Sequence, residues 1–387
     1  MDAPLITVID RNFALQAQID IYTSLLLNRK WQGVGDWQLV LPAAANGADK
    51  LVKDNIILLG ADGHRSGYIE SVKAVEGDNG VMLTVTGKTL QGLATQRITL
   101  PDNDKYNYGY DNVPPLVSNK INPSPVSAET ILKTYADRHM VNPLDPKRKI
   151  PDLILADDLN RGKETVWSSR LETLSDVLQD VCEYCDVGWE IYVDLHRKKL
   201  VFDIVKGVDR SYGQSENSRV IFSRGFDNIL SCTYTDDISG YKNLAYAGGA
   251  GEGADRTIIK VLQDDVDTEP EGWERREIFL DCGALGILET ETTMSLEEEA
   301  KHRLKSYPKK ETFTAPVADT DSFAYLKKWA MGDKVTVVSK GIGKRFDTYI
   351  TEVSEKYEAK ENGLDVTFGA PSTDLGRVIR SIKSKPR

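Results

Sequence analysis

The sequence predicts a mainly β fold with α+β insertions, made of two similar antiparallel β-barrels plus an α+β domain. Short apolar runs separated by polar, glycine-containing turns dominate both ends of the 387-residue chain. One strand pattern occurs twice, around Tyr68 and around Tyr349. Helical periodicity is confined to the middle of the chain and to one segment near residue 300. The length also favours several domains, since one domain usually holds roughly 100 to 200 residues.

The first hundred residues contain closely spaced strand patterns. The apolar runs lie at residues 5–9, 37–41, 56–59, 67–69 and 81–87. A short helical piece is expected near residues 48–52. Strands this close together are typical of a small antiparallel barrel or sandwich.

The strand pattern around Tyr68 returns near the C-terminus. Three segments match in order: residues 54–59 with 333–338 at an offset of 279 (333 − 54), residues 68–72 with 349–353 at an offset of 281 (349 − 68), and Leu83 and Val85 with Leu364 and Val366 at that second offset. The offset changes inside a glycine-rich connection, where a hairpin loop can lengthen without moving either strand. The pattern predicts a duplicated β unit; the alternative is two unrelated β-domains.

The middle third is expected to be α+β. Between Pro101 and Pro125 the composition shifts to Asp, Asn, Tyr and Pro, which predicts a long loop or a domain boundary. A helix is then expected over residues 128–140, with Ser127 as its N-cap.

A second helix is expected over about residues 171–185, where apolar residues recur at three- and four-residue spacing. It should pack on a hairpin made of residues 188–193 and 199–204, with its turn at His196 and Arg197.

One further helix interrupts the β-rich last third. It is expected over residues 296–307, with Ser295 and Glu298 forming a capping box. The expected domains are therefore a first β-barrel over 1–100, a loop and α+β domain over 101–205, a second β-barrel over 206–260 and 315–387, and a helix-containing insertion over 261–314.

Composition excludes several classes of protein. The 49 Lys and Arg against 59 Asp and Glu give a formal charge of −10, which argues against binding to duplex DNA through phosphate contacts. Four cysteines cannot form the disulfide framework of a small secreted domain, so a reducing compartment is expected during synthesis. No apolar run reaches the roughly 18 to 20 residues of a membrane span, and Met1 to Pro4 begin no signal peptide. We expect no membrane insertion.

Two spacings are typical of chemical sites but are better explained by packing. Cys182 and Cys185 have the spacing of a redox or zinc half-site, yet no second Cys or His pair accompanies them and both lie on the apolar stripe of a helix. The glycine-rich run at 248–253 is similar to a phosphate-binding loop. Such a loop must begin a helix, whereas residues 256–261 have a strand pattern.

The other polar candidates form no recognisable site. The acidic run at 264–269 lacks the glycine and terminal glutamate of a calcium-binding loop, and adjacent carboxylates such as Asp157 and Asp158 usually point apart. Four histidines lack the spacing of zinc ligands: His64, His139, His196 and His302. The sequence therefore predicts no catalytic, cofactor-binding or metal-binding residues, no cofactor, and a non-enzymatic assembly protein.

A set of short motifs extends over nearly the whole chain. Its members are residues 8–12, 19–25, 35–39, 41–42, 86–90, 96–98, 228–231, 241–243, 251–256 and 332–335. Each motif alone is weakly specific. Their ordered set resembles a family of siphophage tail-tip proteins, which is related to the central hub proteins of contractile phage tails.

The resemblance implies a virion structural protein, a baseplate hub or tail-tip protein of a phage or phage-like tail. It implies a homotrimer whose two barrels per chain form a pseudo-six-fold ring, adapt the hexameric tail tube to the three-fold tip and line the DNA channel. The implied partners are distal tail or tail-tube proteins, the tape-measure protein and a fibre or spike protein below, with DNA only in transit. The implied location is the virion tail tip, after assembly in the bacterial host cytoplasm.

Two other functions stay open. One is a cell-wall-degrading tail lysin, which longer relatives of this type carry; because the chain ends at Arg387, soon after the second barrel, we expect that activity in another polypeptide. The other is a carbohydrate-binding receptor module using Tyr106, Tyr108 and Tyr110, which lie in a polar loop where aromatic rings could stack on sugars. Packing at a domain or subunit boundary also explains these tyrosines.

Overall fold

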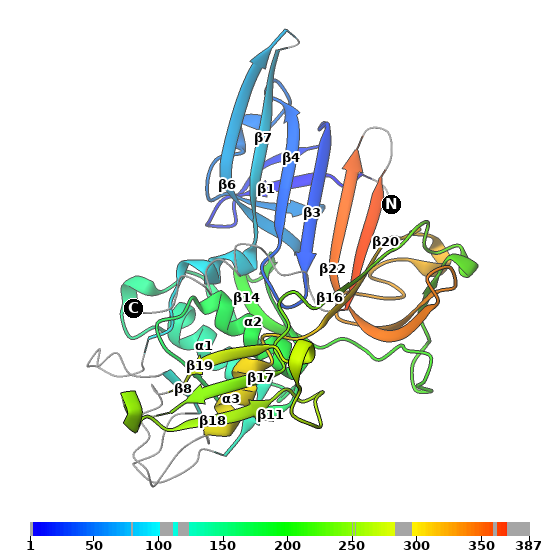
Figure 1. Ribbon diagram of the computed structural model, residues 1–387. Coiled ribbons are helices and arrows are strands. Elements are labelled where there is room, and N and C mark those ends of the chain that lie inside the picture. Colours follow the sequence, from blue (N-terminus) through cyan, green and yellow to red (C-terminus); the bar gives the residue numbers. More distant parts are fainter. Residues whose placement is uncertain are drawn as a thin grey trace.

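The computed structural model describes residues 3–369 except 79, 101–110, 115–123, 250, 252, 283–295 and 359–361. Within these residues, one 13-stranded sheet extends across the molecule and smaller sheets and helices pack beside it (Figure 1). The expected class, mainly β with α+β insertions, is confirmed.

Two copies of a five-stranded antiparallel unit form most of the large sheet. The first contains β3 (Ser24–Lys30), β4 (Asp36–Pro42), β5 (Ile56–Leu59), β6 (Asp62–Gly77) and β7 (Gly80–Thr89). The second contains β16 (Thr233–Asp237), β20 (Lys310–Pro316), β21 (Lys334–Ser339), β22 (Lys344–Glu358) and β23 (Gly363–Gly369). In each unit the spatial order of the strands is first, second, fifth, fourth, third. The duplication predicted from three strands is confirmed and includes five.

A β-bulge lies at the same place in both units. Ile69 pairs with Gly87 and Ser71 with Thr86, and 281 residues later Ile350 pairs with Phe368 and Glu352 with Thr367. One residue is left out of the ladder between the two pairs in each unit. A bulge sets both the bend and the register of its strand, so its repetition shows that the two units are equivalent residue by residue here.

One segment of the predicted alignment is wrong by one residue. The Asp54 N–H donates to Ile69 O, and the Gly332 N–H donates to Ile350 O, so Asp54 corresponds to Gly332 at an offset of 278. Both residues have positive φ, 70° and 90°. All four residues of β5 (Ile56–Leu59) are buried, so apolar side chains occupy both faces of that strand. Without an alternation of apolar and polar residues, the sequence could not show that the alignment of this strand was shifted by one residue.

Neither unit is a closed barrel among the described residues. β3 pairs with β22 of the other unit, so the two units share one continuous sheet. The units also differ beyond their third strands. β1 (Ile6–Ile9) pairs antiparallel with β5 and with β2 (Leu15–Ile19), whereas β15 (Ile221–Ser223) pairs parallel with β21.

Each unit has its own hydrophobic core on one face of the sheet. In the first core Trp37 lies opposite Gly87, and its Nε1 would be only 2.9 Å from a Cβ added there. The corresponding pair in the second core is Phe313 opposite Phe368, with ring centroids 6.2 Å apart. The same inward position of the two cores is thus filled by a Trp–Gly pair in one unit and by a Phe–Phe pair in the other.

The α+β domain lies between the two units in the sequence. Its three-stranded sheet contains β10 (Leu153–Leu155), β14 (Lys199–Val205) and β13 (Gly188–Asp194). Its helices are α1 (Ala128–Ala136), a π-helical turn (Asp137–Val141) and α2 (Leu174–Cys185). Two short strand pairs complete it: β8 (Asp111–Val113) with β12 (Trp167–Ser169), and β9 (Val126–Ser127) with β11 (Glu164–Thr165).

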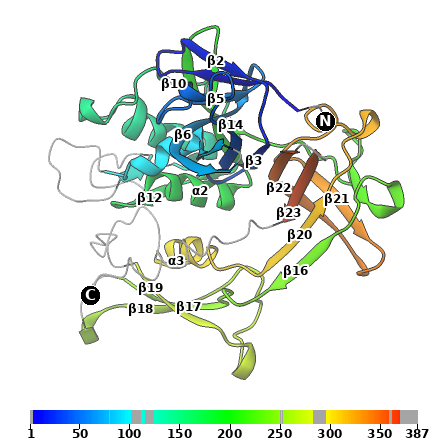
Figure 2. The same ribbon diagram turned by 90° about the horizontal axis from the view of Figure 1, so that it is seen from above.

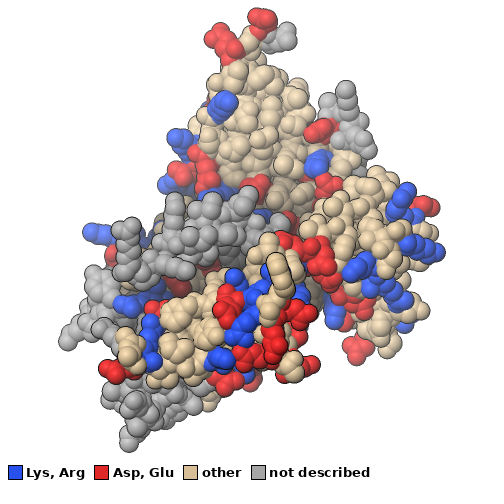
Figure 3. Space-filling model, viewed as in Figure 1, with Lys and Arg blue, Asp and Glu red and all other residues tan. Residues whose placement is uncertain are grey.

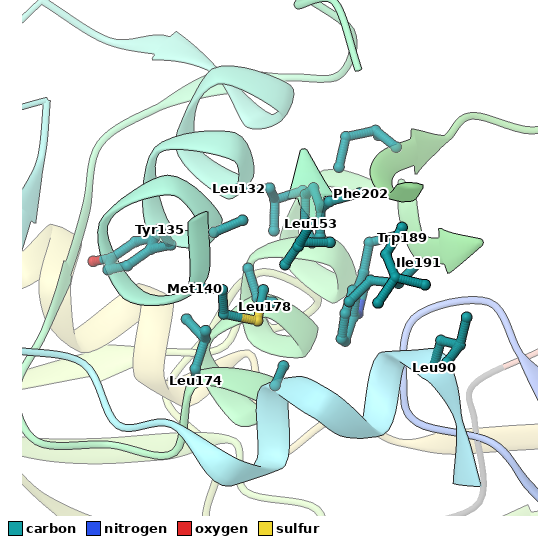
Figure 4. Packing of buried hydrophobic residues seen from close by; sticks show 14 of the residues in the cluster. Leu90, Leu132, Tyr135, Met140, Leu153, Leu174, Leu178, Trp189, Ile191 and Phe202 are labelled. Atoms are coloured by element: carbon teal, nitrogen blue, oxygen red, sulfur yellow. The ribbon is translucent and has the colours of Figure 1, made fainter. Parts of the chain in front are cut away.

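This domain agrees with the sequence-based expectation. Ser127 Oγ accepts a hydrogen bond from the Thr130 N–H at 3.1 Å, as an N-cap does. The second helix begins three residues later than predicted, because Leu171 has a positive φ of 54° that no helix tolerates. Leu178 and Trp189 meet in the core that the helices and the hairpin share (Figure 4).

The remaining helical pieces are short 3-10 turns. They are η1 (Ala48–Lys50), η2 (Leu90–Gln96), η4 (Pro146–Arg148), η5 (Arg224–Phe226), η6 (Gly253–Asp255), η7 (Gly272–Glu274) and η8 (Asp321–Phe323). The first is the helical piece expected near residues 48–52.

An insertion separates β16 from β20. It contains β17 (Leu244–Gly248), β18 (Ile258–Leu262), β19 (Glu277–Asp281) and α3 (Leu296–Leu304), and the helix covers one face of its sheet (Figure 2). Because β17 and β18 lie in this sheet and not in the second unit, the structure favours an insertion that begins near residue 244. The other expected domain boundaries stay predictions, and Ser295 of the expected capping box lies outside the described residues.

The insertion contacts the α+β domain through His302 of α3. The imidazole ring centroid lies 5.4 Å from that of Trp167 and 4.3 Å from that of Tyr184. Burial, with nearby Lys305 and Lys163, lowers the pKa of His302 from its ordinary 6.5 to about 4.

The pKa of His302 predicts a pH dependence of stability. Between about pH 6.5 and pH 4 the unfolded chain binds a proton at this residue and the folded chain does not, so stability falls as the pH falls through this window. Urea denaturation from pH 7 to pH 4.5 should show a shallower dependence in His302→Gln than in wild type. His196→Gln, in the exposed β13–β14 turn, is the control. Equal slopes for His302→Gln and wild type would contradict this account.

The close approach of β6 and β7 predicts a sharp difference between two glycines. A Cβ at Gly87 would lie 1.8 Å from Tyr68 O, whereas one at Gly77, on the same hairpin, meets nothing within 4 Å. We expect Gly87→Ala to lower the free energy of unfolding by about 1–3 kcal/mol, as overpacking does, and Gly77→Ala to change it little. Urea denaturation measures both; similar values for the two variants would show that this contact is not tight.

Candidate assembly interface

The two units meet along one strand pair, β3 with β22. The strands run antiparallel from Lys30 opposite Glu352 to Ser24 opposite Glu358 (Figure 1). The Trp31 N–H donates to a backbone carbonyl of β22 at 2.9 Å and adds one more rung. This pairing joins two five-stranded units into one sheet.

A buried charged cluster lies at this junction. Arg65, from β6, donates through Nε to Glu355 Oε1 at 3.2 Å, and its Nη2 contacts Oε2. The Tyr357 hydroxyl accepts from Arg65 Nη2 at 2.7 Å and donates to Glu355 Oε2 at 2.7 Å. Burial raises the pKa of Tyr357, which keeps the hydroxyl protonated as a donor. Because the Glu355 side chain is only 1% exposed, these contacts must replace the water that it loses.

Aromatic side chains cross the junction in both directions. Trp31, just after β3, lies in the core of the second unit, where its Nε1 donates to Val205 O at 2.9 Å and its ring centroid lies 5.1 Å from that of Tyr349. Tyr357, at the end of β22, lies in the core of the first unit. Each core is therefore completed by a residue of the other unit.

Within the described residues, β6 and β16 each lack a strand neighbour that the equivalent strand of the other unit, β22 or β3, has. β22 pairs along one edge with β21 and then with β3, whereas β6 pairs on that edge with β5 only. Residues 71–77 of β6 are exposed: Val72 is 37% exposed and its counterpart Val353 is 0% exposed. β3 pairs on both edges, whereas β16 pairs with β20 alone.

The face of the joined sheet opposite the two cores is polar. Small hydroxyl and amide side chains alternate there with the core residues: Thr84 and Thr86 of β7, Gln38 of β4, Asn28 of β3, Ser354 of β22, Thr367 of β23 and Thr314 of β20. The surface over β3, β4 and β7 shows few charged side chains, while both signs of charge gather on the insertion (Figure 3). Lys30, Lys88 and Lys356 share this face and form ion pairs with Glu352, Glu70 and Asp365. The sheet is thus apolar on one face and polar on the other.

The two motifs with chemical spacing make contacts within the fold. Cys182 and Cys185 are buried in α2, and burial raises the pKa of both thiols, that of Cys185 to about 12, so they stay protonated and unreactive near neutral pH. In the glycine-rich run, Arg256 donates to Gly249 O at 2.9 Å and to Gly248 O at 3.0 Å. The loop thus binds an arginine through its carbonyls, and the strand β18 follows it as expected.

The acidic candidates bind neighbouring protein groups. Asp264 pairs with Lys305 at 2.7 Å, and Asp265 with Lys309 at 2.9 Å. Asp158 accepts from Thr130 Oγ1 at 2.8 Å. Among the described residues, no group of three or more His, Cys, Asp and Glu could hold a metal ion, and no helix is long and apolar enough to cross a membrane. Tyr106, Tyr108 and Tyr110 lie outside that part of the chain.

Sequence reasoning missed the charged cluster at the junction. The signal was present, because Glu355 lies between Val353 and Tyr357 in the phase of the strand that points inward. A carboxylate at an inward position requires a buried partner. That partner, Arg65, lies 290 residues away in the other unit, and no local pattern connects the two.

Comparison with known proteins gives one family match and several fold matches. The family model described as "Siphovirus ReqiPepy6 Gp37-like protein" matches residues 5–370. No curated protein matches the sequence.

Three solved structures with a similar fold are tail proteins. The 43 kDa tail protein of prophage MuSo2 from Shewanella oneidensis has a TM-score of 0.55 at 12% identity, covering 94% of this chain and 98% of that one. The tail protein from Neisseria meningitidis MC58 has 0.55 at 12% identity, covering 95% and 97%. The prophage tail protein gp18 from Listeria monocytogenes EGD-e has 0.50 at 10% identity, covering 98% of each chain. The fold is shared over nearly the whole chain.

The buried cluster predicts a strong effect of removing one partner. Arg65→Met leaves the Glu355 carboxylate buried without the guanidinium that hydrogen-bonds to it, and we expect a loss of about 3 kcal/mol in the free energy of unfolding. Arg65→Met combined with Glu355→Leu should restore much of this loss. Arg11→Met, which breaks the exposed pair with Asp54, is the matched control and should remain near wild type. Equal destabilisation by Arg65→Met and Arg11→Met would contradict this role.

Proposed function

Because this chain belongs to the Siphovirus ReqiPepy6 Gp37-like protein family of phage tail proteins, we propose that it is the structural hub of a tail tip. Three copies form a ring that adapts the hexameric tail tube to the three-fold tip. The observation that carries this proposal is the duplicated five-stranded unit, whose two copies share one sheet. Three chains with two units each provide six similar units, which removes the mismatch between three-fold and six-fold symmetry.

The arrangement of the hairpins supports docking onto a tube. The β6–β7 and β22–β23 hairpins project in the same direction from the sheet (Figure 1). Val75 and Val81, near the end of the first hairpin, are exposed. Two equivalent projections per chain become six in a trimer, so each subunit of a hexameric tube would meet one of them.

The polar face of the sheet suits the lining of a DNA channel. Its hydroxyl and amide groups are uncharged, and its lysines Lys30, Lys88 and Lys356 form ion pairs with neighbouring carboxylates, which weakens their attraction for phosphate. The chain as a whole carries a net charge of −10, which further disfavours trapping of the passing DNA. In this proposal DNA contacts the protein only in transit.

The proposal assigns the protein a structural role in the virion and no catalysis. Its partners would be distal tail or tail-tube proteins and the tape-measure protein on the tube side, and a fibre or spike protein on the opposite side. Assembly would take place in the host cytoplasm. The shared fold with tail proteins from three bacteria supports a place in the tail.

The oligomeric state tests this function. Light scattering of tail-tip complexes dissociated to the hub should give about three times 43.1 kDa. Incubation of the same material with purified peptidoglycan should release no muropeptides. A hub that is monomeric within assembled tips would overturn the trimer, and release of muropeptides by the pure chain would overturn the non-enzymatic role.

A further inference from the structure

Two edges of the joined sheet are equivalent to the two edges that meet inside the chain. In the first unit, residues 71–77 of β6 continue past β5 with nothing described on that edge. At the equivalent place in the second unit, Glu352 to Glu358 pair with β3. The repeated bulge makes this equivalence unambiguous, since Ser71 and Glu352 follow it at an offset of 281.

The second free edge belongs to β16, the counterpart of β3. Both are the first strands of their units, and the ladders relate them by residue. Trp37 and Phe313 occupy equivalent places in the two units, opposite Gly87 and Phe368. Leu27 of β3 pairs with Trp37, and Tyr234 of β16 pairs with Phe313, so Leu27 and Tyr234 are equivalent. The offset between β3 and β16 is therefore 207 (234 − 27).

On the basis of the proposed function, we infer that β16 of one chain pairs antiparallel with residues 71–77 of β6 of a second copy. The contact repeats between chains the β3–β22 contact within the chain. The expected register follows from the β3–β22 pairs, with 207 added to each residue of β3 and 281 subtracted from each residue of β22. It places Asp237 opposite Ser71, Thr235 opposite Lys73, and Thr233 opposite Val75. Because the two edges lie at opposite units of one chain, the contact is head to tail and can close into a ring.

The exposed side chains fit this pairing. Lys73 would lie diagonally across from Asp237 on the same face, a favourable charge pair. Ile238 follows β16 where Trp31 follows β3, because 238 − 31 is also 207. Trp31 is buried in the core of the neighbouring unit, whereas Ile238 is 42% exposed. In the ring, Ile238 would pack into the core of the neighbouring chain, as Trp31 packs into the core of the neighbouring unit.

Unpaired strand edges also need an explanation in a stable protein. An exposed edge is a template for pairing with other chains, and proteins normally shorten, cover or charge it. β6 is 16 residues long, and its exposed stretch bears Val72, Ala74 and Val75, with Lys73 and Glu76 as the charged residues among them. Pairing with β16 of a second copy would cover this edge and prevent its pairing with unrelated chains.

A disulfide designed on the inferred register tests the contact. Lys73 and Thr235 correspond to Ser354 and Asn28, whose side chains are hydrogen-bonded at 3.1 Å across the internal junction. In a full-length Cys232→Ser chain, we expect Lys73→Cys with Thr235→Cys to give covalent multimers up to the trimer on mild oxidation. Each single variant should give no ladder beyond a dimer. Asn28→Cys with Ser354→Cys is the positive control and should close within one chain.

A second variant probes the same contact without oxidation. Ile238→Asp changes an exposed residue, so the thermal melting of the monomer should stay unchanged. We expect the concentration at which the trimer dissociates to rise roughly tenfold or more, because burial of the isoleucine is lost.

The outcomes separate the inference from the proposed function. A trimer by light scattering that forms no bond between positions 73 and 235, while the internal control closes, would overturn the edge pairing and leave the hub intact. A chain that neither associates nor cross-links at any concentration would overturn both. Covalent trimers from the double variant alone, together with weakened association of Ile238→Asp, support the pairing.

Discussion

The backbone pairing of β3 with β22 is the contact on which the rest of this structure depends. A strand edge leaves a row of N–H and C=O groups that must find partners, and within the chain each of these two edges meets the other. The pairing makes one sheet of two units, brings Arg65 to Glu355, and allows Trp31 and Tyr357 to complete the core of the opposite unit. Without it the two units would be separate, each with an incomplete core.

The sequence predicted the duplication because the fourth and fifth strands of each unit keep both their register and their bulge, so that Tyr68 and Tyr349 lie at matching positions. It did not reveal the first two strands. Trp37 and Leu39 correspond to Phe313 and Ala315, so these equivalent positions keep their apolar character and not their residue types. The insertion of β17 to α3 between β16 and β20 also separates the matching strands in the chain.

Closed barrels were predicted from local strand spacing, and the difference has a physical reason. Alternation along a strand shows which face is buried, but not which strand lies at each edge. Edge partners come from distant parts of the chain: β22 lies more than 300 residues after β3. For the cysteine pair and the glycine-rich run, the neighbouring residues already indicated the helix stripe and the strand that the structure has there.

The central claim is that the edges of β16 and of residues 71–77 are used between chains as those of β3 and β22 are used within one. Hydrogen exchange of the backbone amides, measured on the free chain and on the assembled tip, tests it most directly. The account predicts fast exchange at both edges in the free chain and, in the tip, protection similar to that of β3 and residues 352–358. Exchange at β16 and at residues 71–77 that stays fast in the assembled tip would contradict it.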